Sequence, residues 1–297
     1  MLADRIRSFL KYLQFEKRYS AHTLSSYQTD LGQFADFLKG NFPDTTVDDA
    51  NHSLIRSWII QLSDGALDAS SINRKIACLR SYYKFLLREE VIKQSPMLKI
   101  KVLKTKKKLP HFVNEPDMVS LLDRAEFDNT HDGWRKRLIL ELFYGTGMRL
   151  SELISLKEGQ INLREQTLKV LGKRNKERVI PFSESLVSII ESYRASKRKE
   201  VAMKDHGFLL VTDRGEKLYP VMVNRIVKKY LKLFSSVEKK SPHVLRHTYA
   251  THLLNKGAEI NAVKDLLGHS SLAATQVYTH NTIEKLKKAF DQAHPKA

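Results

Sequence analysis

The segment from Ser241 to Thr248 carries side chains that could bind a phosphate. Ser241 can cap a helix and Pro242 suits its first turn, so a helix is expected to begin here. His243 and Arg246 are three residues apart and would share a face near the helix N-terminus, where the helix dipole favours an anion. An ordinary capped helix is the alternative, and it would need neither side chain.

Common nucleotide and metal signatures are missing from the sequence. The segment 145–147 has two glycines but lacks the third glycine of a dinucleotide fingerprint, and no Gly-Lys-Ser/Thr of a phosphate-binding loop occurs. His243, His247 and His252 could present two ligands on one helix, but the HExxH glutamate is missing and Arg246 sits between them. We therefore expect no metal site and a structural role for His247 and His252.

The chain is strongly basic. Its 297 residues carry 51 Lys and Arg against 33 Asp and Glu, which gives a net charge of +18. Residues 1–100 hold 14 basic and 11 acidic side chains, residues 101–110 hold 5 and 0, and residues 111–297 hold 32 and 22. This excess indicates a polyanionic partner.

The densest run of basic residues lies between two regions that differ in the spacing of their apolar residues. The lysines of this run would repel one another in a free linker, but each would release counterions if the run lay along a phosphate backbone. A solvated linker or a targeting signal is the alternative. The run consists of Lys101, Lys104, Lys106, Lys107 and Lys108.

Residues 1–97 are expected to form a helical domain, because their apolar residues recur at helical spacing. Four amphipathic helices centre on residues 2–13, 24–38, 54–62 and 72–86. The polar side of the fourth would present a basic face within a sector of about 80°, at 100° per residue. We expect this face to contact phosphates rather than to be merely solvated. It holds Asn73, Arg80, Lys84 and Arg88, with Arg74 beside it.

Residues 98–110 are expected to be a basic linker, and residues 111–297 a second domain. Asn114 or Glu115 could cap a helix that has Pro116 in its first turn. Further helices are expected near residues 135–143, 150–156, 184–199, 220–234, 242–255, 259–267, 271–279 and 282–291. Alternating residues at 167–171 and 178–181 predict a β-hairpin, with a third strand at 208–211. The expected fold is mainly α with a small antiparallel β-sheet, in the α+β class.

Cysteine content and hydropathy suggest an intracellular protein. The single cysteine, Cys78, cannot form an internal disulfide, and its place on an apolar helix side predicts a packing role. Charged residues interrupt the first thirteen positions, and no apolar run approaches about 18 residues. Export and membrane spanning are therefore not expected, and a cytoplasmic location follows.

Five segments of the second domain resemble the motifs of the tyrosine recombinase, or phage integrase, family. They are Tyr144–Leu153, Gly172–Arg178, His243–His247, Leu266–Ser270 and Tyr278–His280, in the family's order and at matching spacings. The helical N-terminal region resembles the family's core-binding domain, so the likeness covers nearly the whole chain. Within the family, the sequence is most similar to the bacterial Xer recombinases.

The resemblance implies that Tyr278 attacks a scissile phosphate, leaving a 3′-phosphotyrosyl bond and a free 5′-hydroxyl. It also implies which side chains surround the phosphate: Arg149, His243, Arg246 and His269. Lys173 would protonate the leaving oxygen, with Lys176 in the same turn as a competitor. Glu152 is expected to orient the site, and Arg174 and Lys176 to contact DNA.

Each of these roles has a physical reason. A guanidinium can bind two phosphate oxygens at once and stays cationic at any working pH. A lysine beside Arg174, Lys176 and Arg178 would have its pKa lowered by like charges, toward the range of a general acid. A phosphotyrosine retains the energy of the phosphodiester, so religation needs no ATP. We therefore expect no cofactor and no metal ion.

The activity implied is site-specific recombination of duplex DNA through a Holliday junction, with chromosome dimer resolution at cell division as the Xer-type role. Four protomers, either identical or paired with a second recombinase, would act on two DNA sites. A helix over residues 282–290 is expected to dock on a neighbouring protomer, and packing on its own domain is the alternative. A septal DNA translocase is a further candidate partner. The alternatives are an integrase of a phage or mobile element, a catalytically inert DNA-binding relative, and a type IB topoisomerase.

Overall fold

The computed structural model describes residues 2–105, 110–172, 177–202, 204, 206–268, 290–293 and 295. The chain divides into two compact units, between residues 108 and 109. Each unit has its own hydrophobic core. The predictions for residues 106–108, 173–176 and 269–289 lie outside the described residues.

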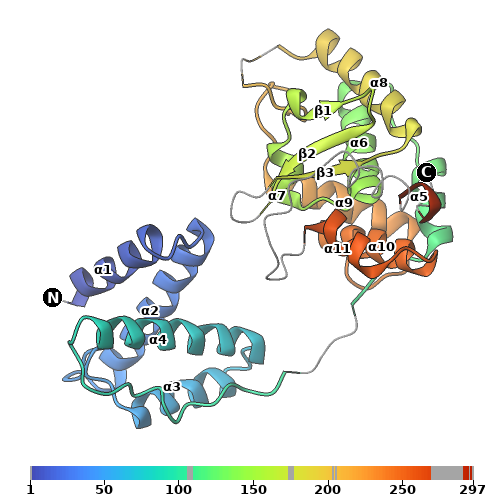
Figure 1. Cartoon of the computed structure of the whole chain (residues 1–297). Coiled ribbons are helices and arrows are strands. Elements are labelled where there is room, and N and C mark those ends of the chain that lie inside the picture. The colour runs from blue at the N-terminus through green and yellow to red at the C-terminus, as the bar shows by residue number, and fades with distance from the viewer. Residues whose placement is uncertain are drawn as a thin grey trace. The chain divides into compact units, whose positions relative to one another are not determined.

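The first unit is built from four helices within the described residues. They are α1 (Leu2–Phe15), α2 (Ala21–Asn41), α3 (His52–Asp64) and α4 (Ala69–Arg88), seen in blue to teal in Figure 1. Side chains cap three of them at the N-terminus, because Ser20, Asn51 and Asp68 each accept a hydrogen bond from a backbone N–H of the first turn. The helical prediction for this region is confirmed.

Aromatic rings fill the core of the first unit. The Phe9 ring meets Tyr82 edge-on at 5.2 Å, and the Phe34 ring lies 4.8 Å from Trp58. Cys78 is buried beside them, and its Sγ donates to the Tyr27 carbonyl at 3.5 Å. Burial raises the pKa of this thiol, so Cys78 is a packing residue, as predicted.

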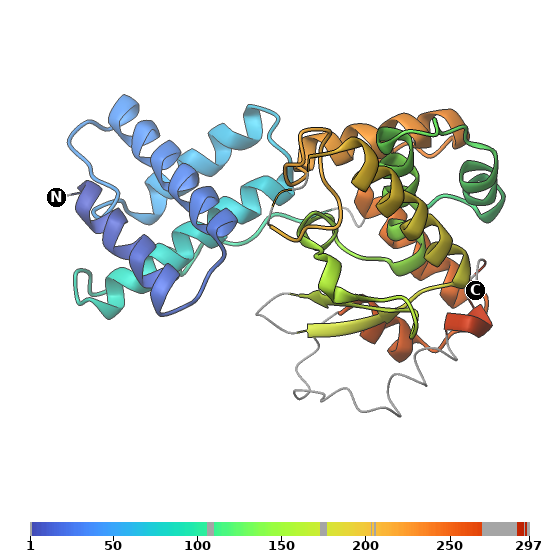
Figure 2. The same ribbon diagram turned by 90° about the horizontal axis from the view of Figure 1, so that it is seen from above.

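The second unit packs helices against a short antiparallel sheet (Figures 1 and 2). Before and within the sheet come α5 (Glu115–Arg124), α6 (His131–Thr146), α7 (Leu150–Ser155), a 3₁₀ turn (Glu158–Gln160), β1 (Ile161–Asn162), β2 (Thr167–Leu171) and β3 (Glu177–Pro181). After the sheet come α8 (Glu184–Glu200), α9 (Pro220–Phe234), α10 (Pro242–Asn255) and α11 (Ile260–Leu267). The predicted α+β class is confirmed.

Helix α6 is the centre of this unit. Its residues from Leu138 to Thr146 are all buried, as expected of a helix that is covered on every side. It packs against α8 and α10. Asn114, rather than Glu115, caps α5 by accepting a hydrogen bond from the Asp117 N–H at 2.8 Å.

The hairpin of β2 and β3 fixes which side chains face the core. Leu168 pairs with Ile180 and Val170 pairs with Arg178, and all four side chains are buried. Lys169, between them in sequence, is exposed on the other face. Because side chains alternate along a strand, Arg178 is forced inward at a position that would otherwise suit an apolar residue.

The predicted third strand at 208–211 is wrong. The third strand is β1, which pairs with β2, while Phe208 and Val211 form only isolated bridges. Side chains of α8 form hydrogen bonds with the backbone groups of this segment instead. Lys197 donates to the carbonyls of Phe208 and Leu209, at 2.7 and 2.9 Å, and the Tyr193 hydroxyl accepts from the Val211 N–H at 3.1 Å. A strand partner therefore has few groups left to pair with.

The described end of the chain packs inside the second unit. Phe290 and Ala293 are each 1% exposed and belong to its core. Phe290 thus packs within its own chain, while residues 282–289, for which docking on a neighbouring protomer is predicted, lie outside the description. In the part of the chain described, no helix is both long and apolar enough to cross a membrane.

Candidate active site

Arg246, on the first turns of α10, is a buried cation with only 5% of its surface exposed. Its Nη1 donates to the Gly147 carbonyl at 2.6 Å, and its Nη2 donates to the Leu267 carbonyl at 2.5 Å. Burial, followed by the charges of Arg149 and Arg178, lowers the pKa of Arg246 to about 9. The guanidinium is still cationic at neutral pH, and an anion placed beside it would offset the cost of its burial.

Arg149 directly precedes α7 and is fixed by Glu152 in the first turn of that helix. The Arg149 backbone N–H donates to Glu152 Oε2 at 2.7 Å, and its Nη1 donates to Oε1 at 2.8 Å. The side chain of Arg149 is 25% exposed, whereas that of Glu152 is 3% exposed. The buried carboxylate of Glu152 thus holds Arg149, and the guanidinium remains accessible to a ligand.

Arg178 is the second partner of Glu152 and is itself buried. Its Nη1 and Nη2 donate to the two carboxylate oxygens of Glu152 at 2.7 and 2.8 Å, in a bidentate pair. Burial alone would raise the pKa of Glu152. The hydrogen bonds and charge of Arg178, followed by the bonds from Arg149, outweigh burial and lower this pKa to about 2. Glu152 is therefore ionised throughout the physiological range.

The C-terminal end of α11 meets all three arginines. A helix leaves its last carbonyls without partners inside the helix. Three consecutive carbonyls here accept from three different elements: Leu266 from Arg178 Nε at 2.9 Å, Leu267 from Arg246 Nη2 at 2.5 Å, and Gly268 from Arg149 Nη2 at 3.1 Å. The negative end of the helix dipole adds to the attraction. The arginine cluster and the α11 end thus stabilise each other.

Two glycines in left-handed conformations allow these contacts. Gly147 ends α6 with φ +59°, and a Cβ there would lie 2.4 Å from the Tyr249 ring. Gly268 ends α11 with φ +61°, and a Cβ there would lie 3.0 Å from the Arg178 side chain. Both backbone conformations therefore favour glycine. At Gly147 the Tyr249 ring also leaves no room for a Cβ, and at Gly268 the Arg178 side chain would have to shift.

His243 is exposed in the first turn of α10, one turn before Arg246. The predicted helix start is confirmed, including Pro242 in the first turn. Ser241 occupies the N-cap but makes no side-chain capping hydrogen bond, so that detail of the prediction is wrong. An exposed imidazole one turn from the buried guanidinium fits a group that reaches a bound phosphate.

The other histidines of α10 have different surroundings. His252 is 3% exposed, with Nδ1 2.9 Å from the Tyr144 hydroxyl and Nε2 2.9 Å from the Val113 carbonyl. Burial lowers the pKa of His252 and, with the nearby charge of His243, that of His247. His252 is a structural residue, as predicted from the sequence.

The remaining predicted catalytic residues lie outside the described part of the chain: Lys173, His269 and Tyr278, with Arg174 and Lys176. The described backbone shows where two of their segments attach. Leu171 pairs with Glu177, the pair nearest the connection between β2 and β3, and Lys173 belongs to the sequence between these two residues. His269 directly follows Gly268, whose carbonyl Arg149 holds.

The residues predicted to bind DNA in the first unit make several contacts within that unit. Asn73 exchanges two hydrogen bonds with the backbone of Leu103, at 2.9 and 2.7 Å, and Arg80 donates to the Ile100 carbonyl at 3.0 Å. These two side chains hold the segment that leads out of the unit against α4. This intramolecular role is not apparent from the sequence pattern.

The other predicted DNA contacts of the first unit are more open. Arg74 is 44% exposed and pairs with buried Asp30, while Arg88 is 51% exposed and pairs with Glu16 at 2.7 Å. Lys84 and Lys104 are both exposed. Arg88 can exchange its exposed ion pair with Glu16 for a phosphate at little cost, because such pairs contribute little.

Helix α9 carries a basic surface that the sequence analysis missed. We call it the α9 basic face. It consists of Arg225, Lys228, Lys229 and Lys232, all exposed, on the side opposite the buried residues Val223, Val227 and Leu231. The signal in the sequence is the recurrence of cations every three or four positions between apolar residues. The face is suited to several phosphates of a duplex.

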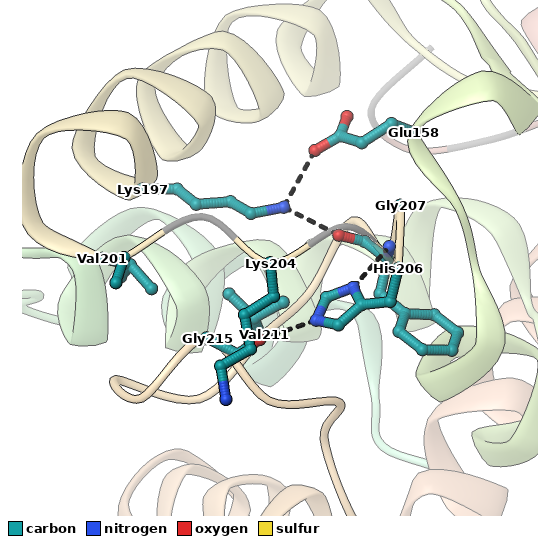
Figure 3. A pocket seen from close by; sticks show the side chains of 10 residues that line it. Glu158, Lys197, Val201, Lys204, His206, Gly207, Val211 and Gly215 are labelled. Carbon is teal, nitrogen blue, oxygen red and sulfur yellow. Dashed lines mark hydrogen bonds and ion pairs between the residues drawn. The ribbon is translucent and has the colours of Figure 1, made fainter.

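A small cavity of about 40 Å³ lies beside the end of α8 and belongs to the framework (Figure 3). Beside the cavity, Lys197 Nζ donates hydrogen bonds to Glu158 Oε1 at 3.1 Å and to the Phe208 carbonyl at 2.7 Å. His206 Nε2 donates to the Gly215 carbonyl at 2.6 Å. Such a volume holds only water, and these polar groups are already paired. No group of three or more potential metal ligands occurs within the described residues.

Sequence comparisons place both units among known proteins. Residues 111–285 match the phage integrase family, and residues 6–90 match the phage integrase N-terminal SAM-like domain. The tyrosine recombinase XerC of Bacillus pumilus is 37% identical, over 98% of this chain and 96% of that protein. The XerC of Staphylococcus saprophyticus is 38% identical, over 98% and 97% respectively.

Solved structures share the fold. The XerH site-specific recombinase bound to a palindromic difH substrate, in a post-cleavage complex, gives a TM-score of 0.72 at 20% identity, covering 96% of this chain and 82% of that chain. The Tn1549 transposon integrase in complex with transposon right end DNA gives a TM-score of 0.72 at 18% identity, covering 97% and 99%.

The pKa of Glu152 predicts a pH dependence of stability. Its folded pKa of about 2 lies below the ordinary value of 4.5, so the ionised group stabilises the fold above pH 4.5, and this is lost as pH falls toward 2. We expect Glu152→Gln to lower the free energy of unfolding by about 3 kcal/mol at pH 7 and by roughly half that at pH 3, measured by urea unfolding. Glu191→Gln, at an exposed position of α8, is the control. A Glu152→Gln deficit that stays constant with pH contradicts the assignment.

Proposed function

The chain belongs to the phage integrase family and is a DNA-breaking and rejoining enzyme of the Xer type, and we propose that Tyr278 is its nucleophile, attacking a phosphate bound by Arg149 and Arg246. The observation that carries the proposal is the arginine cluster. Two cations from different elements are fixed by buried acceptors, next to the carbonyl of Gly268, where the segment leading to Tyr278 begins.

The two arginines stabilise the charge that develops in the reaction. Each guanidinium has five N–H donors, and the contacts already made leave donors on both side chains for phosphate oxygens. Phosphoryl transfer gathers negative charge on the non-bridging oxygens of the phosphate. Cations fixed before the reaction stabilise that charge without reorganisation at the moment of transfer. His243 and His269 would complete the ring of donors.

The covalent step conserves bonds. The Tyr278 oxygen attacks phosphorus while the bond from phosphorus to the 5′-oxygen breaks, which gives a 3′-phosphotyrosyl link and a 5′-hydroxyl. Tyr278 loses its proton to solvent, and Lys173 gives one to the leaving oxygen, with Lys176 as the alternative donor. A tyrosine hydroxyl has an ordinary pKa of about 10, so the nearby cations are needed to favour the phenolate. Reversal of the step by a new 5′-hydroxyl rejoins the strand without ATP.

DNA binding is proposed for cations of both units. The α9 basic face would lie along the duplex from the second unit, and Arg74, Lys84, Arg88 and Lys104 would bind it from the first. The lysines at 106–108 would add to the affinity for DNA. These contacts read phosphates and supply affinity rather than sequence choice.

The substrate proposed is a pair of chromosomal recombination sites, exchanged through a Holliday junction by four protomers. The XerC relatives and the lambda integrase tetramer solved on a Holliday junction support this assembly. A septal DNA translocase would act upstream of the enzyme, and chromosomal DNA would place the protein with the nucleoid. An integrase of a mobile element would share the chemistry, and the Tn1549 integrase shares the fold, so the substrate rather than the site separates the two.

The central test of the reaction is a covalent adduct. A nicked suicide substrate that carries the cognate core site, incubated with the protein and EDTA, should give a protein–DNA adduct on a denaturing gel. Tyr278→Phe removes the nucleophile and should abolish the adduct while leaving DNA binding unchanged. An adduct of normal yield in Tyr278→Phe would refute the assignment of the nucleophile.

The α9 basic face predicts a change in the salt dependence of binding. Each phosphate contact contributes about 0.9 to the slope of log K against log salt concentration. Replacing Lys228 and Lys229 with Gln should therefore reduce the slope by about 2 in titrations followed by fluorescence anisotropy. The matched control replaces two adjacent exposed cations of α8, Arg198 and Lys199, and should leave the slope unchanged. Equal effects of both pairs would contradict a specific role for α9.

A further inference from the structure

Arg178 has every one of its nitrogens engaged by groups of the candidate site. Its two Nη atoms bind the carboxylate of Glu152, and its Nε donates to the Leu266 carbonyl at 2.9 Å. The side chain is 3% exposed, and because groups of the protein hold all three of its nitrogens, we assign it no direct contact with DNA. It is therefore not among the groups that could touch the phosphate.

The partners of Arg178 connect it to both ends of the arginine cluster. Through Glu152 it reaches Arg149, which the same carboxylate binds at 2.8 Å. Through Leu266 it reaches the end of α11, whose next two carbonyls are held by Arg246 and Arg149. One buried side chain on β3 thus joins the start of α7 to the end of α11.

We propose that Arg178 is a positioning residue: it holds Arg149 in its phosphate-binding orientation through Glu152, and it fixes the α11 end from which the segment bearing His269 and Tyr278 departs. The inference rests on the proposed function for its catalytic consequence. The contacts themselves are independent of that function.

The planar guanidinium is essential to this role. Three N–H groups point in three fixed directions, two toward Glu152 and one toward Leu266. A lysine at this position would preserve the positive charge, but its single ammonium cannot form the bidentate pair and also reach the carbonyl. If Arg178 only neutralised a buried carboxylate, Arg178→Lys would suffice.

The test compares Arg178→Lys with a matched control, Arg194→Lys. Arg194 also pairs with a carboxylate, Glu158, at 2.8 Å, but it lies on α8, and its bonds within the described residues go to Glu158 rather than to the cluster. We expect Arg178→Lys to bind the core site with unchanged affinity and to form the adduct about 10- to 100-fold more slowly at saturating DNA. Arg194→Lys should match the wild type in both measurements.

Hydrogen exchange reports the positioning without DNA. In Arg178→Lys the amide of Arg149, which donates to Glu152, and the amide of Gly268, which caps α11, should exchange about tenfold faster. Both should be unchanged in Arg194→Lys.

The outcomes separate the inference from the proposed function. A wild-type protein that forms no adduct refutes the proposed function, and the exchange rates at Arg149 and Gly268 then decide the inference. If Arg178→Lys forms the adduct at the wild-type rate, and its Arg149 and Gly268 amides exchange at wild-type rates, the inference is overturned. A loss of DNA affinity equal to the loss of cleavage rate also overturns it, because a positioning residue should act on the chemical step alone.

Discussion

The site of this protein depends on one buried carboxylate. Glu152 is 3% exposed on its side chain and accepts hydrogen bonds from two arginine side chains and one backbone N–H. A buried ion costs several kcal/mol unless its partners are close and well oriented, so each of these donors is under strong constraint. The constraint fixes the start of α7, the inward face of β3 and, through Arg178, the end of α11.

This arrangement explains how a chain with more basic than acidic residues can hold cations in position for a phosphate. Protein oxygens orient Arg149 and Arg246. In the proposed function these contacts persist while other donors of both side chains bind the phosphate. Burial, followed by the charges of Arg149 and Arg178, lowers the pKa of Arg246 to about 9, so negative charge brought beside this guanidinium would be favourable. A phosphate supplies that charge. In the proposed function, binding and catalysis thus draw on the same electrostatic imbalance.

Much of this was predictable from sequence, and the exceptions share a cause. Helical periodicity predicted α1 to α4, and alternation predicted the hairpin of β2 and β3, because those patterns are local. The strand predicted at 208–211 failed because Lys197 and Tyr193, on the preceding helix α8, form hydrogen bonds with its backbone. Alternation within β3 could also have shown that Arg178 points inward opposite Val170, but its partner lies 26 residues earlier and periodicity says nothing of it. Long-range pairing of polar groups is what the patterns leave undetermined.

The central claim is that the protein orients the arginines before any phosphate binds. Two crystal structures of the DNA-free protein, one without an oxyanion and one with orthovanadate in the site, test it directly. The account predicts that the guanidinium groups of Arg149 and Arg246 move by less than about 0.5 Å between them and keep their bonds to Glu152, Leu267 and Gly268 in both. Guanidinium groups that lack those bonds without the anion, and acquire their positions only when it binds, would contradict it.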